Sequence, residues 1–380
     1  MGRRIQSSAL KDGLANGLAS PFRGLGGAVR HPVSKYALAI GLLSYVIWSN
    51  WEPKSGLGLK TVWEERITQG KIHYQFFALA AAICLASLMI TLVRWYVLVR
   101  AVNLPFRLLD AFRLGFIGLF FNTFLPGSVG GDIIKAAFLA REQDRRTVAV
   151  ATVIMDRAIA LWALIWFVAL LGGAFWAGGF LEGSGFGVEQ SKLIIQSAAG
   201  IVAVTLTLWL LMGLLPAYRA ERFASRLERI PKVGGSAAEF WRAVWMYRCR
   251  QRSVAACMLV SWVGHVGFVL TFYFSVRTLW EPGERIPELW QHFLVVPIGL
   301  VINAMPLFPG GAGIGELGFG GLYRWLDCDA AIGVLGSLVQ RVIMWSWGAA
   351  GYLVYLRMKP ALKQAKVSTT GDFDANAEKE

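Results

Sequence analysis

Six long apolar runs dominate this sequence and limit the folds open to it. They cover residues 35–51, 74–100, 147–176, 193–215, 253–279 and 330–357. A helix needs about 20 apolar residues to cross a hydrocarbon core roughly 30 Å thick. Only 16% of the residues are charged and 56% are hydrophobic, which is too apolar for a water-soluble domain of this length. The sequence therefore predicts an all-α polytopic membrane protein with about six spanning helices.

The distribution of charge predicts how the helices are oriented. Lys and Arg gather in 1–35, in the loop 216–252 and just after 357, whereas 177–192 and 280–290 hold more Glu than Lys and Arg. The positive-inside rule places the basic segments in the cytoplasm, so both termini are expected there, in a bacterial inner membrane. The net charge of +14 follows this pattern, so no nucleic-acid partner is expected.

One loop fits the rule poorly. The loop 52–73 should be external, yet it contains Lys54, Lys60, Arg66 and Lys71, which Glu52, Glu64 and Glu65 offset in part.

Three segments are expected along the chain. Residues 1–34 form a basic cytoplasmic segment, 35–358 an integral membrane domain, and 359–380 a polar tail that is expected to be disordered. The four cysteines show no CxxC spacing, so neither a disulfide framework nor a metal site is expected. No cofactor is expected either.

Two broken apolar elements lie between the runs. The first is "FFNTFLPGSVGGDIIKA", residues 120–136, whose arms 113–125 and 132–140 are each too short to span. Basic residues flank both ends, so we predict a re-entrant hairpin whose tip reaches toward the middle of the membrane. Non-helical backbone at that depth must be buried in protein or line a wet cavity.

The second broken element is "NAMPLFPGGAGIGELGFG", residues 303–320, which should enter from the opposite face. Its first arm, 289–308, is long enough to span if straight, although Pro297 and Pro306 interrupt it. A hairpin and a full crossing both remain open here.

The two broken elements match each other at a nearly constant spacing along the chain. Pro126 corresponds to Pro309, Asp132 to Glu316, and Arg157 to Arg341. The units 74–176 and 253–358 each read as helix, broken hairpin, helix, and they start from opposite sides. We interpret them as an inverted-topology repeat.

This repeat predicts a central anionic site. In such repeats the interrupted helices meet near the midplane and offer free N–H groups and positive dipole ends to an anion. Arg157 and Arg341 lie roughly 15 Å into their helices, where an arginine costs about 2.5–3.5 kcal/mol on insertion scales and needs a partner. Because guanidinium pairs well with phosphate, we predict that both bind an anionic headgroup, with Asp132 and Glu316 orienting them or binding its polar remainder.

The predicted substrate-binding residues are Asn122, Gly127, Gly130, Gly131, Asp132, Asp156, Arg157, Asn303, Gly310, Gly311, Gly313, Glu316 and Arg341. Each alone has a simpler explanation: a helix kink, a packing glycine, or an ion pair between helices. Arg94 and Lys135 are expected to reach the cytoplasmic interface. The duplication of different features at one spacing favours a site.

A family resemblance appears at these residues. The motifs "NTFLPGSVGGD", "MDRAIALW" and "PLFPGGAGIGE" resemble the flippase-like membrane domain of bacterial lysylphosphatidylglycerol synthases and related stand-alone proteins. The resemblance covers roughly 35–357. It implies movement of a lipid between leaflets, such as an aminoacylated phospholipid or a polyprenyl-phosphate-linked sugar. Aminoacyl transfer belongs to a separate soluble domain in that family, so synthase activity is not expected here.

The sequence leaves two main functions open. The first is a lipid translocator. The second is a membrane-embedded transferase acting on a lipid-linked substrate, in which Asp132 and Glu316 could act as acid and base. No HxxxD, DxxD or Ser-His arrangement occurs at the motif positions, so no catalytic residue is assigned. A weaker third hypothesis is a partner of lipid-modifying enzymes.

Overall fold

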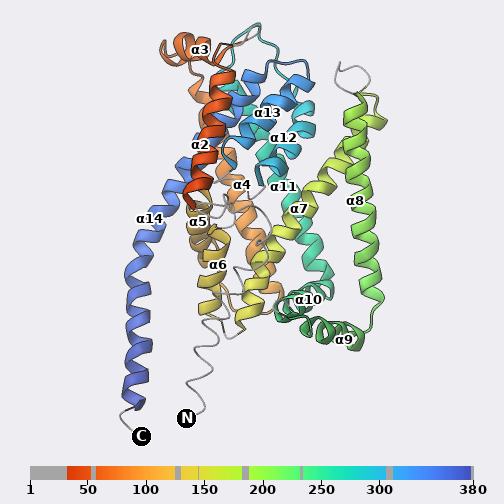
Figure 1. The fold of residues 1–380 in the computed structure, drawn as a ribbon, viewed down its shortest axis with the longest axis vertical. Helices are drawn as coiled ribbons and strands as arrows, with labels where there is room; N and C mark the ends of the chain where they lie inside the picture. Colours follow the sequence, from red (N-terminus) through yellow and green to blue (C-terminus); the bar gives the residue numbers. More distant parts are fainter. Residues whose placement is uncertain are drawn as a thin grey trace.

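The computed structural model of this chain describes residues 32–52, 57–124, 130–143, 145–181, 188–231, 234–304 and 311–377. Every regular element in these residues is a helix, and no strand occurs among them (Figure 1). The predicted fold class, an all-α polytopic membrane protein, is confirmed.

Five of the described helices are long and apolar enough to cross a membrane. They are α4 (Tyr74–Ala101), α7 (Arg146–Ala177), α8 (Val188–Leu214), α11 (Gln251–Arg277) and α14 (Ala330–Ala377). These coincide with five of the six predicted spans. The remaining run forms α2 (Pro32–Ser49), whose described apolar part is shorter. Helix α14 extends to Ala377.

Two pairs of short helices occupy the positions of the broken elements. The first pair is α5 (Leu108–Phe124) and α6 (Gly130–Arg141), and the second is α12 (Leu289–Ala304) and α13 (Ile314–Trp325). They contain 17, 12, 16 and 12 residues, so each is about 18–26 Å long and shorter than the hydrocarbon core.

The two short pairs lie in opposite halves of the molecule. Figure 1 places α5 and α6 in the lower half and α12 and α13 in the upper half. The turns between the helices, including both Pro-Gly dipeptides, lie outside the described residues. The re-entrant path of each pair and the inverted repeat stay predictions.

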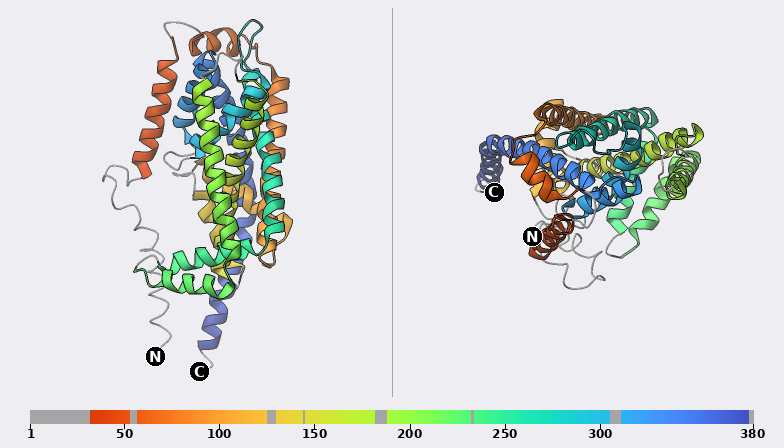
Figure 2. Two further views of the ribbon diagram at one scale, coloured as in Figure 1. Left: turned by 90° about the vertical axis from the view of Figure 1, so that its right-hand side faces the viewer. Right: turned by 90° about the horizontal axis from the view of Figure 1, so that it is seen from above.

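The long helices pack into a bundle around the short pairs. Helices α4 and α11 pack along each other, α7 contacts both of them, and α8 lies at one side of the bundle (Figure 2). One buried cluster centres on Trp95 and Leu98 of α4, and another on Phe272 of α11 and Phe319 of α13.

Helix α14 joins the two halves, because it packs on both α5 and α13. Its contact with α5 is made through glycines. A Cβ atom on Gly351 would lie 2.1 Å from the carbonyl oxygen of Phe116, and one on Gly348 would lie 3.3 Å from the hydroxyl oxygen of Thr123. The two helix backbones therefore approach closely.

The segment 216–252, treated as a loop in the sequence analysis, contains two helices. They are α9 (Ala217–Glu228) and α10 (Gly234–Arg248), which lie across the lower end of the bundle (Figure 1). Tyr247 anchors α10 by donating to the carbonyl of Leu98 at 3.0 Å. Arg242 of α10 pairs with Glu221 and, at 2.8 Å, with Glu228 of α9, and its hydrogen bond lowers the pKa of the Glu221 carboxyl.

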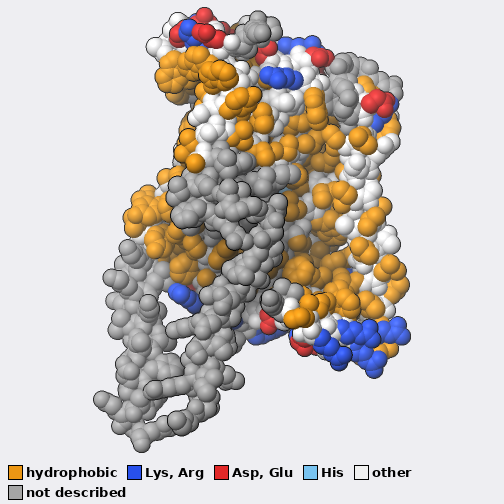
Figure 3. All heavy atoms as spheres, viewed as in Figure 1, with side chains coloured by type: hydrophobic (Ala, Val, Ile, Leu, Met, Phe, Trp, Pro, Cys, Tyr) orange, Lys and Arg blue, Asp and Glu red, His pale blue; other side chains and the backbone are white. Residues whose placement is uncertain are grey.

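The outer face of α9 combines aromatic and basic side chains. Tyr218 and Phe223 are exposed, and the guanidinium groups of Arg219 and Arg222 lie over the Tyr218 ring. Figure 3 shows Lys and Arg side chains gathered at this end of the molecule. Such a helix is typical of a membrane interface. Ala220 and Ala224, four residues apart, are the buried residues of α9, and this spacing was the signal of a helix that sequence reasoning missed.

Two basic residues of the loop that fitted the positive-inside rule poorly are paired with carboxylates. It contains α3 (Leu59–Val62) and the π-helix η2 (Trp63–Ile67). Arg66 is buried and pairs with Glu284, while Lys60 pairs with Glu52 at 2.5 Å. Because they are paired, Lys60 and Arg66 contribute little free positive charge to this loop.

Gly131 is expected to be a strict packing position. A Cβ there would lie 1.9 Å from the carbonyl oxygen of Gly118, so backbone would have to move. We expect Gly131→Ala to destabilise the protein by about 1–3 kcal/mol, measured as a lower thermal unfolding temperature in detergent. Gly321→Ala is the control, because no atom lies within 4 Å of a Cβ there. Equal unfolding temperatures for both variants would contradict the close approach of α5 and α6.

Candidate functional site

The first half of the molecule holds a carboxylate–arginine pair at the start of α6. Asp132 lies in the first turn of α6, and its Oδ2 accepts a hydrogen bond from Nε of Arg157 on α7 at 2.7 Å. The Asp132 side chain is 9% exposed, whereas that of Arg157 is 51% exposed. Asn122 connects the end of α5 to the start of α6, because its Oδ1 accepts from the N–H of Gly131 at 2.7 Å.

The second half holds a similar pair at the start of α13. Oε1 of Glu316 accepts from Nε of Arg341 on α14 at 2.6 Å, and its Oε2 accepts from the N–H of Gly313 at 2.7 Å. Arg341 also donates to the carbonyl of Gly311 at 3.2 Å. The Glu316 and Arg341 side chains are 0% and 8% exposed, so this pair is enclosed.

The two pairs share one geometry. In each, the arginine follows its carboxylate by 25 residues. Each arginine also lies equally far from the first residue of its helix, about 16 Å along the axis. Asp132 and Glu316 therefore orient the two arginines. The pairs differ in exposure, because the first is open at Arg157 and the second is closed.

A third buried pair connects three long helices. Nε of Arg94 on α4 donates to Oδ1 of Asp156 on α7 at 2.9 Å, and its Nη1 donates to Oγ of Ser261 on α11 at 3.1 Å. Arg94 is 4% exposed, so the expectation that it reaches the interface is wrong. Asp156, predicted to bind substrate, is engaged by Arg94.

Lys135 is also buried, at 7% exposed, and not at the interface as expected. Its Nζ lies 4.2 Å from the centre of the Trp95 ring. A Cβ atom on Gly118 would lie only 2.5 Å from the Lys135 Cδ. The small residue on α5 therefore makes room for the lysine of α6.

The predicted glycines are only partly described. Gly127 and Gly310 lie outside the described residues, whereas Gly130 and Gly131 open α6. Gly311 and Gly313 have φ values of 69° and 85°, which side chains rarely tolerate.

Asn303 lies beside the second pair. A Cβ on Gly311 would be 1.8 Å from its Oδ1, and one on Gly315 would be 2.8 Å away. The N–H groups of Gly131 and Gly313 were expected to be free for an anion, but Asn122 and Glu316 occupy them. An anion would therefore depend on side-chain cations for these interactions.

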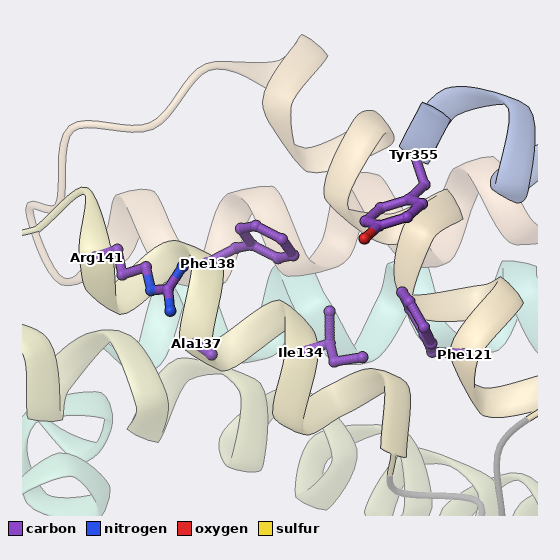
Figure 4. Close-up of a pocket in the computed structure, with 6 residues that line it drawn as sticks. All are labelled: Phe121, Ile134, Ala137, Phe138, Arg141 and Tyr355. Carbon is purple, nitrogen blue, oxygen red and sulfur yellow. The ribbon is translucent and has the colours of Figure 1, made fainter. Parts of the chain in front are cut away.

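An apolar groove of about 230 Å³ runs along the outside of the first short pair (Figure 4). Four residues on one face of α6 line it together with one residue each from α5 and α14: Ile134, Ala137, Phe138, Arg141, Phe121 and Tyr355. The Arg141 guanidinium stands at one end, beyond the Phe138 ring. The groove thus combines an apolar floor with a terminal cation, and sequence reasoning did not identify it.

Five long apolar helices and buried ion pairs between them define a polytopic membrane protein with a polar interior. The chain belongs to the family of the lysylphosphatidylglycerol synthase TM region, which matches residues 35–351. This family is a membrane domain linked to lipid translocation.

A curated relative is UPF0104 membrane protein PH1989 from Pyrococcus horikoshii. It is 23% identical over 308 residues, which cover 76% of this chain and 88% of the relative. No solved structure matches the chain.

The different exposure of the two pairs predicts different costs of breaking them. Glu316→Gln leaves Arg341 buried without its carboxylate, which should cost about 3–5 kcal/mol. Asp132→Asn should cost less, because the Arg157 side chain is half exposed rather than enclosed. Thermal unfolding of both variants in one detergent measures the order. A larger loss for Asp132→Asn would contradict the enclosed state of the second pair.

Proposed function

We propose that this protein is a lipid translocator in the cell membrane, with its basic lower end in the cytoplasm. It moves an anionic or phosphate-containing lipid, such as a phospholipid or a polyprenyl-phosphate-linked sugar, between leaflets. The observation that carries the proposal is the duplicated carboxylate–arginine pair, which is half exposed in one half of the molecule and enclosed in the other.

Arg157 can bind a phosphate without leaving Asp132. A guanidinium carries five N–H donors in a fixed fork, and Asp132 accepts from Nε alone. The carboxylate therefore fixes the orientation of the arginine, and the remaining donors can bind phosphate oxygens in pairs. The 51% exposure of this side chain gives a headgroup access to it.

The enclosed pair supports an alternating mechanism. If the two halves are an inverted repeat, a movement that encloses Arg157 would expose Arg341 at the other side. The headgroup then exchanges one arginine for the other near the middle of the membrane. Neither site needs to release its carboxylate.

The groove beside α6 can hold part of an acyl or prenyl chain. Its lining is mostly apolar, and Arg141 at its end can pair with an anionic headgroup before the headgroup enters. At about 230 Å³ it is smaller than a typical ligand pocket, which fits one chain segment rather than a whole lipid.

The transferase hypothesis has less support from the geometry. Asp132 and Glu316, the candidate acid and base, are both paired with arginines, so each carboxylate is already engaged in orienting a guanidinium group. A translocator leaves the mass of the lipid unchanged, whereas a transferase forms a new product, so mass spectrometry of the lipid separates the two.

We expect Arg157→Ala and Arg341→Ala each to reduce lipid relocation to the rate of protein-free vesicles, because each removes one of the two phosphate-binding groups. The measurement is leaflet exchange of a fluorescent anionic lipid in vesicles with reconstituted protein. Arg113→Ala is the control, since Arg113 forms an exposed pair with Asp110 at 3.7 Å. Wild-type relocation by both variants would remove the arginines from the mechanism.

We also expect Ala137→Trp to slow relocation, because the indole would fill the groove between α6 and α14. Ile133→Trp on the same helix is the control, since Ile133 is exposed and does not line the groove. Both variants are assayed with one long-chain anionic lipid. Equal rates for the two would show that the lipid chain does not use the groove.

A further inference from the structure

The two halves of the molecule share one ion pair but differ in the residues around it. Helices α6 and α13 correspond when Asp132 is aligned with Glu316. In this alignment Lys135 corresponds to Phe319. The same spacing, applied to α7 and α14, matches Asp156 with Gln340. Two charged residues of the first half are thus uncharged in the second.

The packing of these residues supports the correspondence. The Lys135 Nζ lies 4.2 Å from the Trp95 ring centre on α4, and the Phe319 ring lies 4.1 Å from that of Phe272 on α11. Trp95 and Phe272 occupy the same position when counted from the first residues of α4 and α11. A lysine on a tryptophan in one half is therefore replaced by two stacked phenylalanines in the other.

The same alignment of α4 with α11 identifies the third difference. In this alignment Thr271 corresponds to Arg94. The Thr271 hydroxyl donates to the carbonyl of Gly267 in its own helix at 2.9 Å. The second half therefore has no equivalent of the Arg94–Asp156 pair among its described residues.

The charges of the first half do not balance. Lys135 lies one turn after Asp132 on α6, where Asp132 pairs with Arg157, and Asp156, next to Arg157 on α7, pairs with Arg94. With Lys135 they give three cations against two anions, whereas Glu316 and Arg341 balance in the second half. Arg94 and Arg157 each have a carboxylate partner, so Lys135 is the surplus cation.

The surplus charge is buried in the helix bundle. Lys135 is 7% exposed and lies on the Trp95 ring, with no hydrogen bond or ion pair to another described residue. An uncompensated cation in the interior of a membrane protein is costly. One phosphate oxyanion that enters beside the exposed Arg157 would remove that cost.

We propose that Lys135 and Arg157 together bind the phosphate oxyanion of the substrate, so that the first half is the anion-binding half. In the second half the positions that correspond to Lys135, Arg94 and Asp156 are uncharged, so that half receives the headgroup only through Arg341. The biological role of this site rests on the proposed translocation, but anion binding can be measured without it.

The test is isothermal titration of purified wild-type protein in neutral detergent with short-chain phosphatidylglycerol, short-chain diacylglycerol, which lacks the phosphate, and inorganic phosphate. Lys135→Phe installs the residue of the second half, and Lys135→Arg keeps the charge. The matched control is Lys192→Phe, because Lys192 also lies over a tryptophan, Trp176, at 5.6 Å.

We expect Lys135→Phe to weaken binding of phosphatidylglycerol about tenfold or more, while Lys135→Arg and Lys192→Phe stay close to wild type. The phosphate-free diacylglycerol should bind alike to all variants. If the binding of inorganic phosphate depends on Lys135 in the same way, the phosphate group alone is sufficient for recognition. If inorganic phosphate does not bind, the rest of the lipid is also required. If Lys135→Phe does not purify in folded form, Lys135→Gln replaces it.

Unchanged binding of phosphatidylglycerol by Lys135→Phe would overturn the proposal. So would an equal loss for both lipids, because the effect would then be structural. The same variants are also assayed for lipid relocation. Binding that depends on Lys135 in a wild-type protein that relocates no lipid would refute translocation and leave the anion site standing.

Discussion

A guanidinium group inside an apolar helix bundle requires a carboxylate, and this requirement explains the arrangement of the short helices. Arg157 and Arg341 lie about 16 Å into their helices, too deep for their side chains to reach water along a continuous helix surface. A short helix that starts at this depth places a first-turn carboxylate beside each arginine. The broken elements thus deliver one acid each to the level at which the arginine lies. The glycines at their starts allow the backbones to come close enough.

The apolar runs and the duplicated motifs predicted much of this from the sequence. Helix length and hydrophobicity fixed the positions of α4, α7, α8, α11 and α14, because few other folds accommodate such runs. The repeated spacing of the motifs related Asp132 to Glu316 and Arg157 to Arg341. It did not establish that members of each half pair with one another, since that depends on the turn geometry.

Other features depend on contacts that leave no local pattern. Arg94 and Lys135 lie near the ends of apolar segments, where long basic side chains usually extend to the interface. Arg94 is buried because it pairs with Asp156 of α7, and Lys135 because it lies on the Trp95 ring of α4. The groove beside α6 needs α5 and α14 to complete it. Helices α9 and α10 were missed for another reason: their many arginines gave a charge signal that obscured the helical spacing.

The seam between α5 and α14 has a mechanical consequence. Gly348 and Gly351 bring the two backbones together, and the rings of Phe120 and Tyr352 pack beside them with their centroids 5.0 Å apart. Close backbones and packed rings resist both separation and shear, so α5 and α14 are coupled. Since α14 also packs on α13, a displacement of α5 in one half would be transmitted through α14 to the other.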